Sequence, residues 1–304
     1  MAFVLRRLMQ AALTVFATLT VVFALVHVSG NPVGLYLPVT ASSEQVRTME
    51  HLLGFDRPLY VQYAAYVWSA AHGDLGASFS QSLPALPLVL DRLPNTLYVT
   101  LFALGMMIVV AIPLGIASAT RSGSPLDFLG SGVAVFGQSV PVFWLGLVLV
   151  LVFGVNLKWF PTFGSGGLRH VVLPGVTLGT YSMGVITRLV RSSMLDTYHS
   201  DYLRTARAKG LPQARVILKH ALPNAILPAL TMIGLQVAYL LSGAIVTEQV
   251  FSYPGMGQLV LQAINARDFN VVQSFVMVVA AVTVLVNTTT DITYSRIDPR
   301  MTYG

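Results

Sequence analysis

The chain of 304 residues is 55% hydrophobic and only 10% charged, with a mean hydropathy of +0.71. A soluble domain carries roughly 25% charged residues, so this composition excludes a chain that covers its whole surface with hydrated side chains. The sequence contains no cysteine, which excludes disulfides, thiolate catalysis and Cys-ligated metals.

Apolar runs recur along the chain, and their length of about 20 residues is what the hydrocarbon core of a bilayer demands. The sequence therefore predicts an all-α polytopic membrane protein with about six transmembrane helices. We place these helices at Leu8–Val28, Thr96–Ala119, Leu126–Val155, Val171–Val190, Leu227–Val250 and Val272–Ile292. The first run is longer than the core of a signal peptide, about 7 to 15 residues, so we expect it to remain as an uncleaved span.

Basic residues are distributed unevenly between the two sides of this arrangement. If both termini are cytoplasmic, twelve of the 18 Lys and Arg residues lie inside or at the inner edge of the membrane. That bias follows the positive-inside rule. This distribution explains the net charge of +6 by membrane orientation and contact with lipid, so no nucleic-acid partner is expected.

The chain divides into two parts by this pattern. Residues 1–93 hold the first transmembrane helix and a long external segment, and residues 94–304 hold a core of five transmembrane helices. The external segment carries an aromatic group that is typical of short helices at a membrane interface, namely Tyr60, Tyr63, Tyr66 and Trp68. Two alternatives remain for this segment, packing on the membrane domain or contact with an external partner.

Polar side chains within the predicted spans are candidates to line a translocation path, because a central charge costs roughly 2.5 to 3.5 kcal/mol there. Gln138 and Ser139 precede Pro141, which permits a kink in the third span. Glu248 lies near the outer end of the fifth span, and Asn287 and Asp291 lie toward the inner end of the sixth. The alternative is that these groups pair with neighbouring helices or reach an interface.

The loop between the fourth and fifth spans predicts a short basic helix from Asp201 to Lys209. Ser200 or Asp201 can accept hydrogen bonds from the first turn, Gly210 can adopt the left-handed conformation that ends a helix, and Pro212 prevents its continuation. A second helix is expected from Gln213 to Leu222, with a break at Pro223. Resting on anionic lipid headgroups is the simpler role for such a loop.

The spacing of this loop resembles the EAA loop of ABC-importer permeases. The triplet falls on Arg204, Thr205 and Ala206, the glycine on Gly210, and the L-P pair on Leu222 and Pro223. Arg204 replaces the leading Glu of that pattern, and His220 replaces the usual Ile. The sequence Y-L-R-T-A-R-A-K-G, followed by K-H-A-L-P-N-A, is similar to the corresponding loop in the dipeptide, oligopeptide and nickel branch of the family.

Further motifs extend this resemblance over almost the whole chain. They are L-G-x-D-x-P-L-x-x-Q-Y at Leu53–Tyr63, G-D-L-G-x-S at Gly73–Ser78, E-x-V-F-x-x-P-G-x-G-x-L at Glu248–Leu259, and R-D-x-x-x-x-Q at Arg267–Gln273. The external segment after the first span is similar to that of the B-type subunit of this branch.

The resemblance implies a type I importer permease of the bacterial inner membrane that forms half of the path for a peptide or related small solute. Its implied partners are a paralogous second permease, two cytoplasmic ABC ATPase subunits or domains, an extracytoplasmic solute-binding protein, and membrane lipid. The residues implied to couple the permease to the ATPase are Asp201, Tyr202, Arg204, Thr205, Ala206, Arg207, Lys209 and Gly210. The implied solutes are dipeptides, oligopeptides, glutathione, nickel chelates and sugars.

The chain has no G-x-x-x-x-G-K-[ST] loop that could hold ATP phosphates, so we expect it to be no enzyme and to bind no cofactor. ATP and Mg would be used by the partner ATPase subunits. The six histidines show no metal-ligand spacing, and no catalytic arrangement is evident. The competing function is a proton- or ion-coupled secondary transporter with Glu248 or Asp291 as the titrating group.

Overall fold

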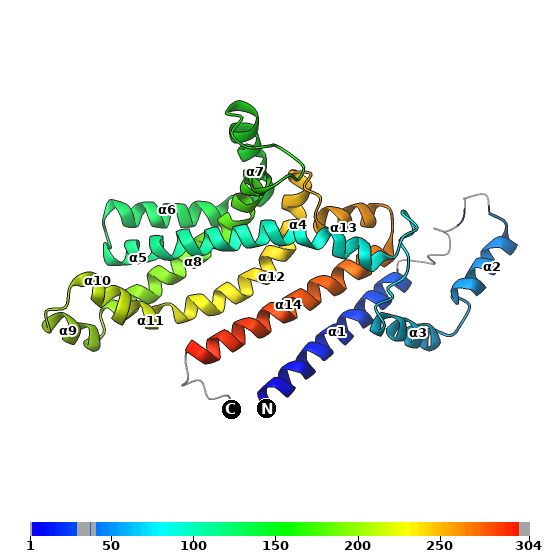
Figure 1. Ribbon diagram of the computed structural model, residues 1–304, viewed down its shortest axis with the longest axis horizontal. Coiled ribbons are helices and arrows are strands. Elements are labelled where there is room, and N and C mark those ends of the chain that lie inside the picture. The colour runs from blue at the N-terminus through cyan, green and yellow to red at the C-terminus, as the bar shows by residue number, and fades with distance from the viewer. Residues whose placement is uncertain (1, 29–36, 38–40, 298–304) are drawn as a thin grey trace. The chain divides into compact units, whose positions relative to one another are not determined.

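The computed structural model describes residues 2–28, 37 and 41–297 of the chain (Figure 1). Within these ranges the secondary structure consists of helices and one isolated β-bridge between Ala77 and Pro84. This composition confirms the all-α prediction. The chain forms two compact units, one holding residues up to Pro94 with Gln258–Leu285, and the other holding Asn95–Gly257 with the stretch that begins at Val286.

The first unit contains α1 (Ala2–Val28) and the two short external helices α2 (Ser43–Leu53) and α3 (Leu59–Ala71). A capping box formed by Ser42 and Gln45 starts α2, and Gly54 ends it in the left-handed conformation. Helix α3 packs on α1, where the hydroxyls of Thr20 and Tyr63 lie 2.6 Å apart.

The second unit is organised around α8 (Leu168–Tyr198), which packs against α5 (Ile112–Thr120), α6 (Pro125–Ser139), α7 (Val142–Leu149) and α12 (Leu227–Val250). The helix α4 (Ala85–Met106) runs into α5 through the π-helical segment η2 (Met107–Ala111). In Figure 1 α5, α6 and α8 lie side by side. Small residues on α8 allow this close packing of apolar helices.

Three helical runs among the described residues are long and apolar enough to cross a membrane: Ala85–Thr120, Leu227–Val250 and Phe269–Thr290. They coincide with the second, fifth and sixth predicted spans. The last of them belongs to α14 (Phe269–Ile297), which follows the shorter α13 (Met256–Asn265). In α1, which holds the first predicted span, the apolar stretch is the shorter Ala12–Ala24. Helix α8 holds the residues of the fourth predicted span but is not among the helices that are apolar enough to cross a membrane by composition.

The third predicted span is not one continuous helix. Helix α6 and the run formed by α7 and η3 (Val150–Asn156) meet at an angle of 107°, so they form a broken span or a re-entrant loop. The break falls where Val140 has extended backbone, with ψ of 127°, directly before Pro141. A proline lacks the amide that would continue the helix, and it disfavours helical geometry in the residue before it.

The loop after α8 forms α9 (Asp201–Ala208), α10 (Gln213–Arg215), the π-helical η4 (Val216–Ala221) and α11 (Leu222–Ala225). The helix expected from Asp201 is therefore present, and Gly210 has the expected left-handed φ of 74°.

Two details of that loop differ from the prediction. The hydroxyl of Ser200 donates to the carbonyl of Thr197 at 2.6 Å, and its side chain makes no capping hydrogen bond to α9. The second helix does not break at Pro223, since this proline occupies the first turn of α11, where no amide donor is needed.

Candidate functional site

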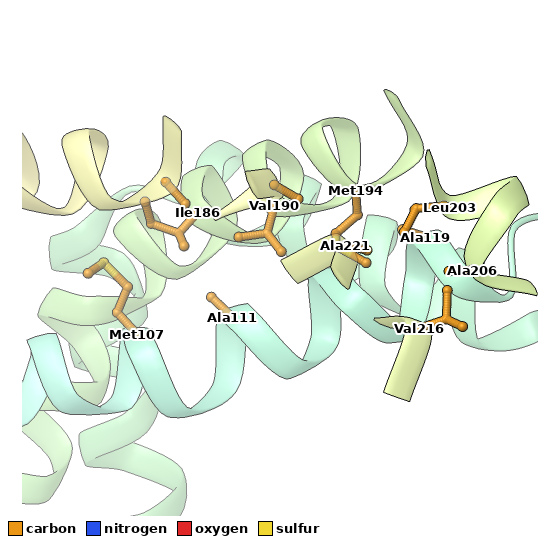
Figure 2. Close-up of a cluster of buried hydrophobic side chains, with 12 residues drawn as sticks. Met107, Ala111, Ala119, Ile186, Val190, Met194, Leu203, Ala206, Val216 and Ala221 are labelled. Atoms are coloured by element: carbon orange, nitrogen blue, oxygen red, sulfur yellow. The ribbon is translucent and has the colours of Figure 1, made fainter. Parts of the chain in front are cut away.

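Helix α9 has one buried and one exposed face. Leu203 is fully buried and Ala206 is 8% exposed, three residues apart and therefore on the same side of the helix. Figure 2 shows both side chains in a cluster with Ala119 of α5, Met194 of α8 and Val216 of η4. The cluster links α9, which packs on η4, to α5 and α8 of the second unit. Ala206, one of the residues implied to couple the permease to the ATPase, is part of this core.

The other predicted coupling residues lie on the exposed part of the loop, and they are Asp201, Tyr202, Arg204, Thr205, Arg207, Lys209 and Gly210. Arg207 donates to the carbonyl of Tyr198 at 3.1 Å and lies over its ring, 4.2 Å from the centroid. The hydroxyl of Tyr202 accepts a hydrogen bond from Asn224 at 3.0 Å. The charges of Arg204 and Lys209 have no partner among the described residues, so this face offers free positive charge.

Gly210 follows this helix with no atom within 4 Å of the place where a Cβ would stand. Its left-handed backbone, and not crowding, is therefore what requires glycine. The open space at Gly210 leaves room for a partner to approach, so its part in a contact with the ATPase stays a prediction.

Gln138 lines a hollow of about 600 Å³ in the second unit. Its Nε2 donates to the carbonyl of Ala134 at 3.1 Å, and its Oε1 accepts from Arg188 at 3.3 Å. Ser139 is exposed at the end of α6, but it is not among the residues that line this hollow. Of the two neighbouring candidates, only Gln138 faces the hollow.

Glu248 is completely buried, and its carboxylate is held by the outer loop that follows α12. Thr96 donates to Oε1 at 2.6 Å, and the amide of Gly257 donates to Oε2 at 2.7 Å. A Cβ on Gly255 would lie within 2.4 Å of both carboxylate oxygens, so the glycines of this motif make room for Glu248. Pairing with a neighbouring helix was the alternative to a path-lining role, and these contacts support it.

The remaining candidates lie on α14. Asn287 is half-buried and does not line the hollow around Gln138, so the described contacts do not bring it together with Gln138 or Glu248. The side chain of Asp291 lies outside what the structure describes.

One charged pair was missed by the sequence analysis. Asp127 at the start of α6 binds Arg191 of α8 through two hydrogen bonds of 2.6 and 2.9 Å, and the amide of Gly123 donates to the same carboxylate at 3.0 Å. The residues are 64 positions apart, so no local spacing could have indicated the pair.

Two outer motifs of the sequence also meet in the first unit. The carboxylate of Asp268 accepts hydrogen bonds from the hydroxyls of Ser78 and Ser80, the latter at 3.0 Å. Asn270 donates to the carbonyl of Ala77 at 2.7 Å. The turn before α14 thus holds the G-D-L-G-x-S loop in place.

Long apolar helices, a sharply bent helix pair and an exposed basic helix outside the apolar runs define a multi-pass helical membrane protein. The family model for the binding-protein-dependent transport system inner membrane component matches residues 111–303, and the model of its N-terminal part matches residues 1–100. The chain belongs to this family and is the membrane component of a binding-protein-dependent transport system, not its ATPase.

Curated relatives match over essentially their whole length. The dipeptide transport system permease protein DppB of Alkalihalophilus pseudofirmus is 39% identical, with 100% of each chain covered. The glutathione transport system permease protein GsiC of Salmonella typhimurium is 37% identical, with 99% of each covered, and DppB of Escherichia coli K12 is 37% identical, with 98% of each covered.

Solved structures support the fold. The inward-facing MetNI methionine ABC transporter gives a TM-score of 0.57 at 18% identity, covering 69% of this chain and 96% of that one. An amino acid ABC transporter with histidines gives 0.51 at 17% identity, covering 71% and 94%. Both are ABC transporters, which agrees with the type I importer permease fold expected from the resemblance.

Proposed function

We propose that this chain is the B-type permease subunit of an ATP-driven importer for a dipeptide, an oligopeptide or glutathione. It would pair with a paralogous second permease and receive its solute from an extracytoplasmic binding protein. The dipeptide and glutathione permeases among its full-length relatives support this solute class. Both termini and the loop that contains α9 would face the cytoplasm, as the distribution of basic residues indicates.

The observation that carries the proposal is the two-sided construction of α9. Its exposed face presents Arg204 and Lys209, which suit a groove on a cytoplasmic ATPase subunit that carries acidic side chains. Its buried face places Leu203 against α5 and α8 through the shared core. A displacement of α9 by the ATPase would therefore move these two helices as well, because packed interiors shift as units.

The chain itself would bind neither ATP nor Mg in this mechanism. Two ATPase subunits would bind and hydrolyse the nucleotide, and α9 would transmit their closure to the membrane helices. Tyr202 would anchor the contact, and its hydroxyl is already oriented by Asn224. Arg207, fixed on the Tyr198 ring, would stiffen the end of α9.

The experiment is reconstitution of the permease pair with its ATPase subunits and binding protein in liposomes. Uptake of a labelled dipeptide or of glutathione should require ATP and should stop when the phosphate-binding lysine of the ATPase is replaced. Uptake that follows an imposed proton gradient without ATPase subunits would instead establish a secondary transporter. Loss of ATP-driven uptake on replacement of Gly210 by a bulky residue is the matching test of the α9 contact, and intact uptake would contradict it.

A further inference from the structure

The hollow around Gln138 is walled mainly by faces of the helices α6 and α8, and Met232 of α12 also lines it. Helix α6 contributes Ser131 and Gln138, seven residues apart, and α8 contributes Arg188 and Ser192, four residues apart. Residues at these spacings share one helix face. The hollow therefore has a polar strip on each wall, within a unit whose packed surfaces are mostly apolar.

The two walls are fixed relative to each other. A Cβ on Gly184 of α8 would lie 2.6 Å from the carbonyl oxygen of Ala134 on α6, so the two backbones touch. The same Ala134 carbonyl accepts the hydrogen bond from Nε2 of Gln138. This bond fixes the amide so that Oε1 is turned toward Arg188, which means that the polar strip exists before any ligand arrives.

Two arginines line the hollow, and they differ in how their charge is matched. Arg191 is neutralised by Asp127 through the two hydrogen bonds described above. Arg188, one turn earlier, is exposed, and among the described residues its one hydrogen bond is that of 3.3 Å to the neutral amide of Gln138. No acidic side chain lines this hollow among the residues that the structure describes, so its walls carry one unmatched positive charge.

We propose that Arg188, oriented by Gln138, binds a carboxylate of the transported solute in this hollow. The inference rests on the proposed function, since it takes the hollow to be part of the translocation path. A guanidinium binds a carboxylate through two parallel hydrogen bonds, and the hydroxyls of Ser131 and Ser192 can donate to the same group. Peptides and glutathione all carry such a carboxylate, whereas an unmatched charge in a span is costly without a ligand or water.

The absence of cysteine from the sequence allows a direct measurement of the local charge. Ser192→Cys in the assembled transporter, in nanodiscs of zwitterionic phosphatidylcholine, is labelled with two methanethiosulfonate reagents, one ending in sulfonate and one in trimethylammonium. The positive charge of Arg188 should raise the labelling rate of the anionic reagent relative to that of the cationic one, and the ratio of these two rates is the measured quantity. Arg188→Gln should lower this rate ratio about tenfold, because a unit charge acts strongly over a few ångströms in a partly enclosed site.

Two further variants serve as controls. Arg188→Lys keeps the charge and should keep the ratio, and Arg215→Gln removes an exposed charge that does not line the hollow and should leave the ratio unchanged. Assembly of each variant with the other subunits is checked by size-exclusion chromatography. A ratio that does not respond to Arg188→Gln overturns the inference.

Nanodiscs that contain phosphatidylglycerol distinguish the source of the anion. If lipid headgroups occupied the site, they would suppress labelling by the anionic reagent to the level of Arg188→Gln, which would overturn the assignment to the solute. An unchanged ratio supports the solute. ATP-driven uptake by the parent transporter tests the proposed function separately, so an unresponsive ratio with intact uptake would remove only this inference.

Discussion

The hydroxyl of Thr96 donates a 2.6 Å hydrogen bond to Oε1 of Glu248 and accepts one of 2.8 Å from the amide of Met256. These hydrogen bonds hold the carboxylate of Glu248 in the interior of the second unit, where it also accepts one from the amide of Gly257 in the outer loop after α12. The arrangement explains why Glu248 is followed by glycines at positions 255 and 257, since side chains there would occupy the space of the carboxylate.

Replacing Glu248 by alanine should destabilise the chain by about 3 to 5 kcal/mol, because buried donors lose their charged acceptor. Glu248→Gln keeps one acceptor oxygen and should cost less. Thermal unfolding of the purified protein in detergent, followed by size-exclusion chromatography, measures both effects. Equal melting temperatures for the alanine variant and the parent would contradict the anchoring role of this carboxylate.

Truncation of Leu203 should separate ATP hydrolysis from transport. Leu203→Ala removes a fully buried side chain from the core that α9 shares with η4, α5 and α8, a change that costs about 2 to 5 kcal/mol when the site cannot collapse. We expect the reconstituted complex to hydrolyse ATP with reduced uptake per ATP. Leu203→Met, which conserves volume, should restore the ratio of uptake to hydrolysis. An unchanged ratio in the alanine variant would argue against transmission through this core.

Charge reversal on the exposed face of α9 should weaken binding to the ATPase subunits. The double variant Arg204→Glu, Lys209→Glu should lower their association and reduce its sensitivity to salt, because surface charges act mainly on encounter. Pull-down at two salt concentrations measures this effect. Lys158→Glu is the matched control, since it makes the same kind of change in a loop predicted to lie outside the membrane. Equal binding by the double variant and the control would contradict the proposed contact.

Removal of the Tyr66 hydroxyl should make the first unit more stable. That hydroxyl is buried and has no hydrogen-bond partner in the part of the chain that the structure describes, so Tyr66→Phe relieves a desolvation cost of about 1 to 3 kcal/mol. Tyr63→Phe is the contrasting variant, because it breaks the contact with Thr20 and should destabilise. Melting temperatures of the two variants should therefore shift in opposite directions, and a lower value for Tyr66→Phe would be the contrary result.

Burial also raises the pKa of Tyr66 from 10.0 to about 12, with a smaller contribution from Tyr63. The stability that depends on the neutral phenol is fully present below pH 10 and is lost as the pH rises through about 12. Absorbance titration of the phenolate should show this late ionisation in the parent protein, and Tyr66→Phe should reduce its amplitude by that of one tyrosine. Ionisation of all tyrosines near pH 10 would contradict the buried environment.

Local sequence signals predicted the features that depend on neighbouring residues. The left-handed Gly210 and the helix from Asp201 follow from residue conformational preferences within one loop. The apolar runs at Leu227–Val250 and Val272–Ile292 follow from composition over the length of one span. The 107° bend at Pro141 could be anticipated as a kink, but its size depends on the packing of α6 against α8 and could not.

The sequence by itself therefore determined an all-helical membrane chain, its family and the position of the loop helix, because these depend on hydrophobicity, residue preferences and ordered motifs. Only the tertiary structure decided which polar groups are matched. In that structure Glu248 is buried and hydrogen-bonded to Thr96. Asp127 binds Arg191, 64 positions away, and Arg188 lines the hollow. Charge pairing depends on distances of a few ångströms between residues far apart in the chain, and no local pattern encodes those distances.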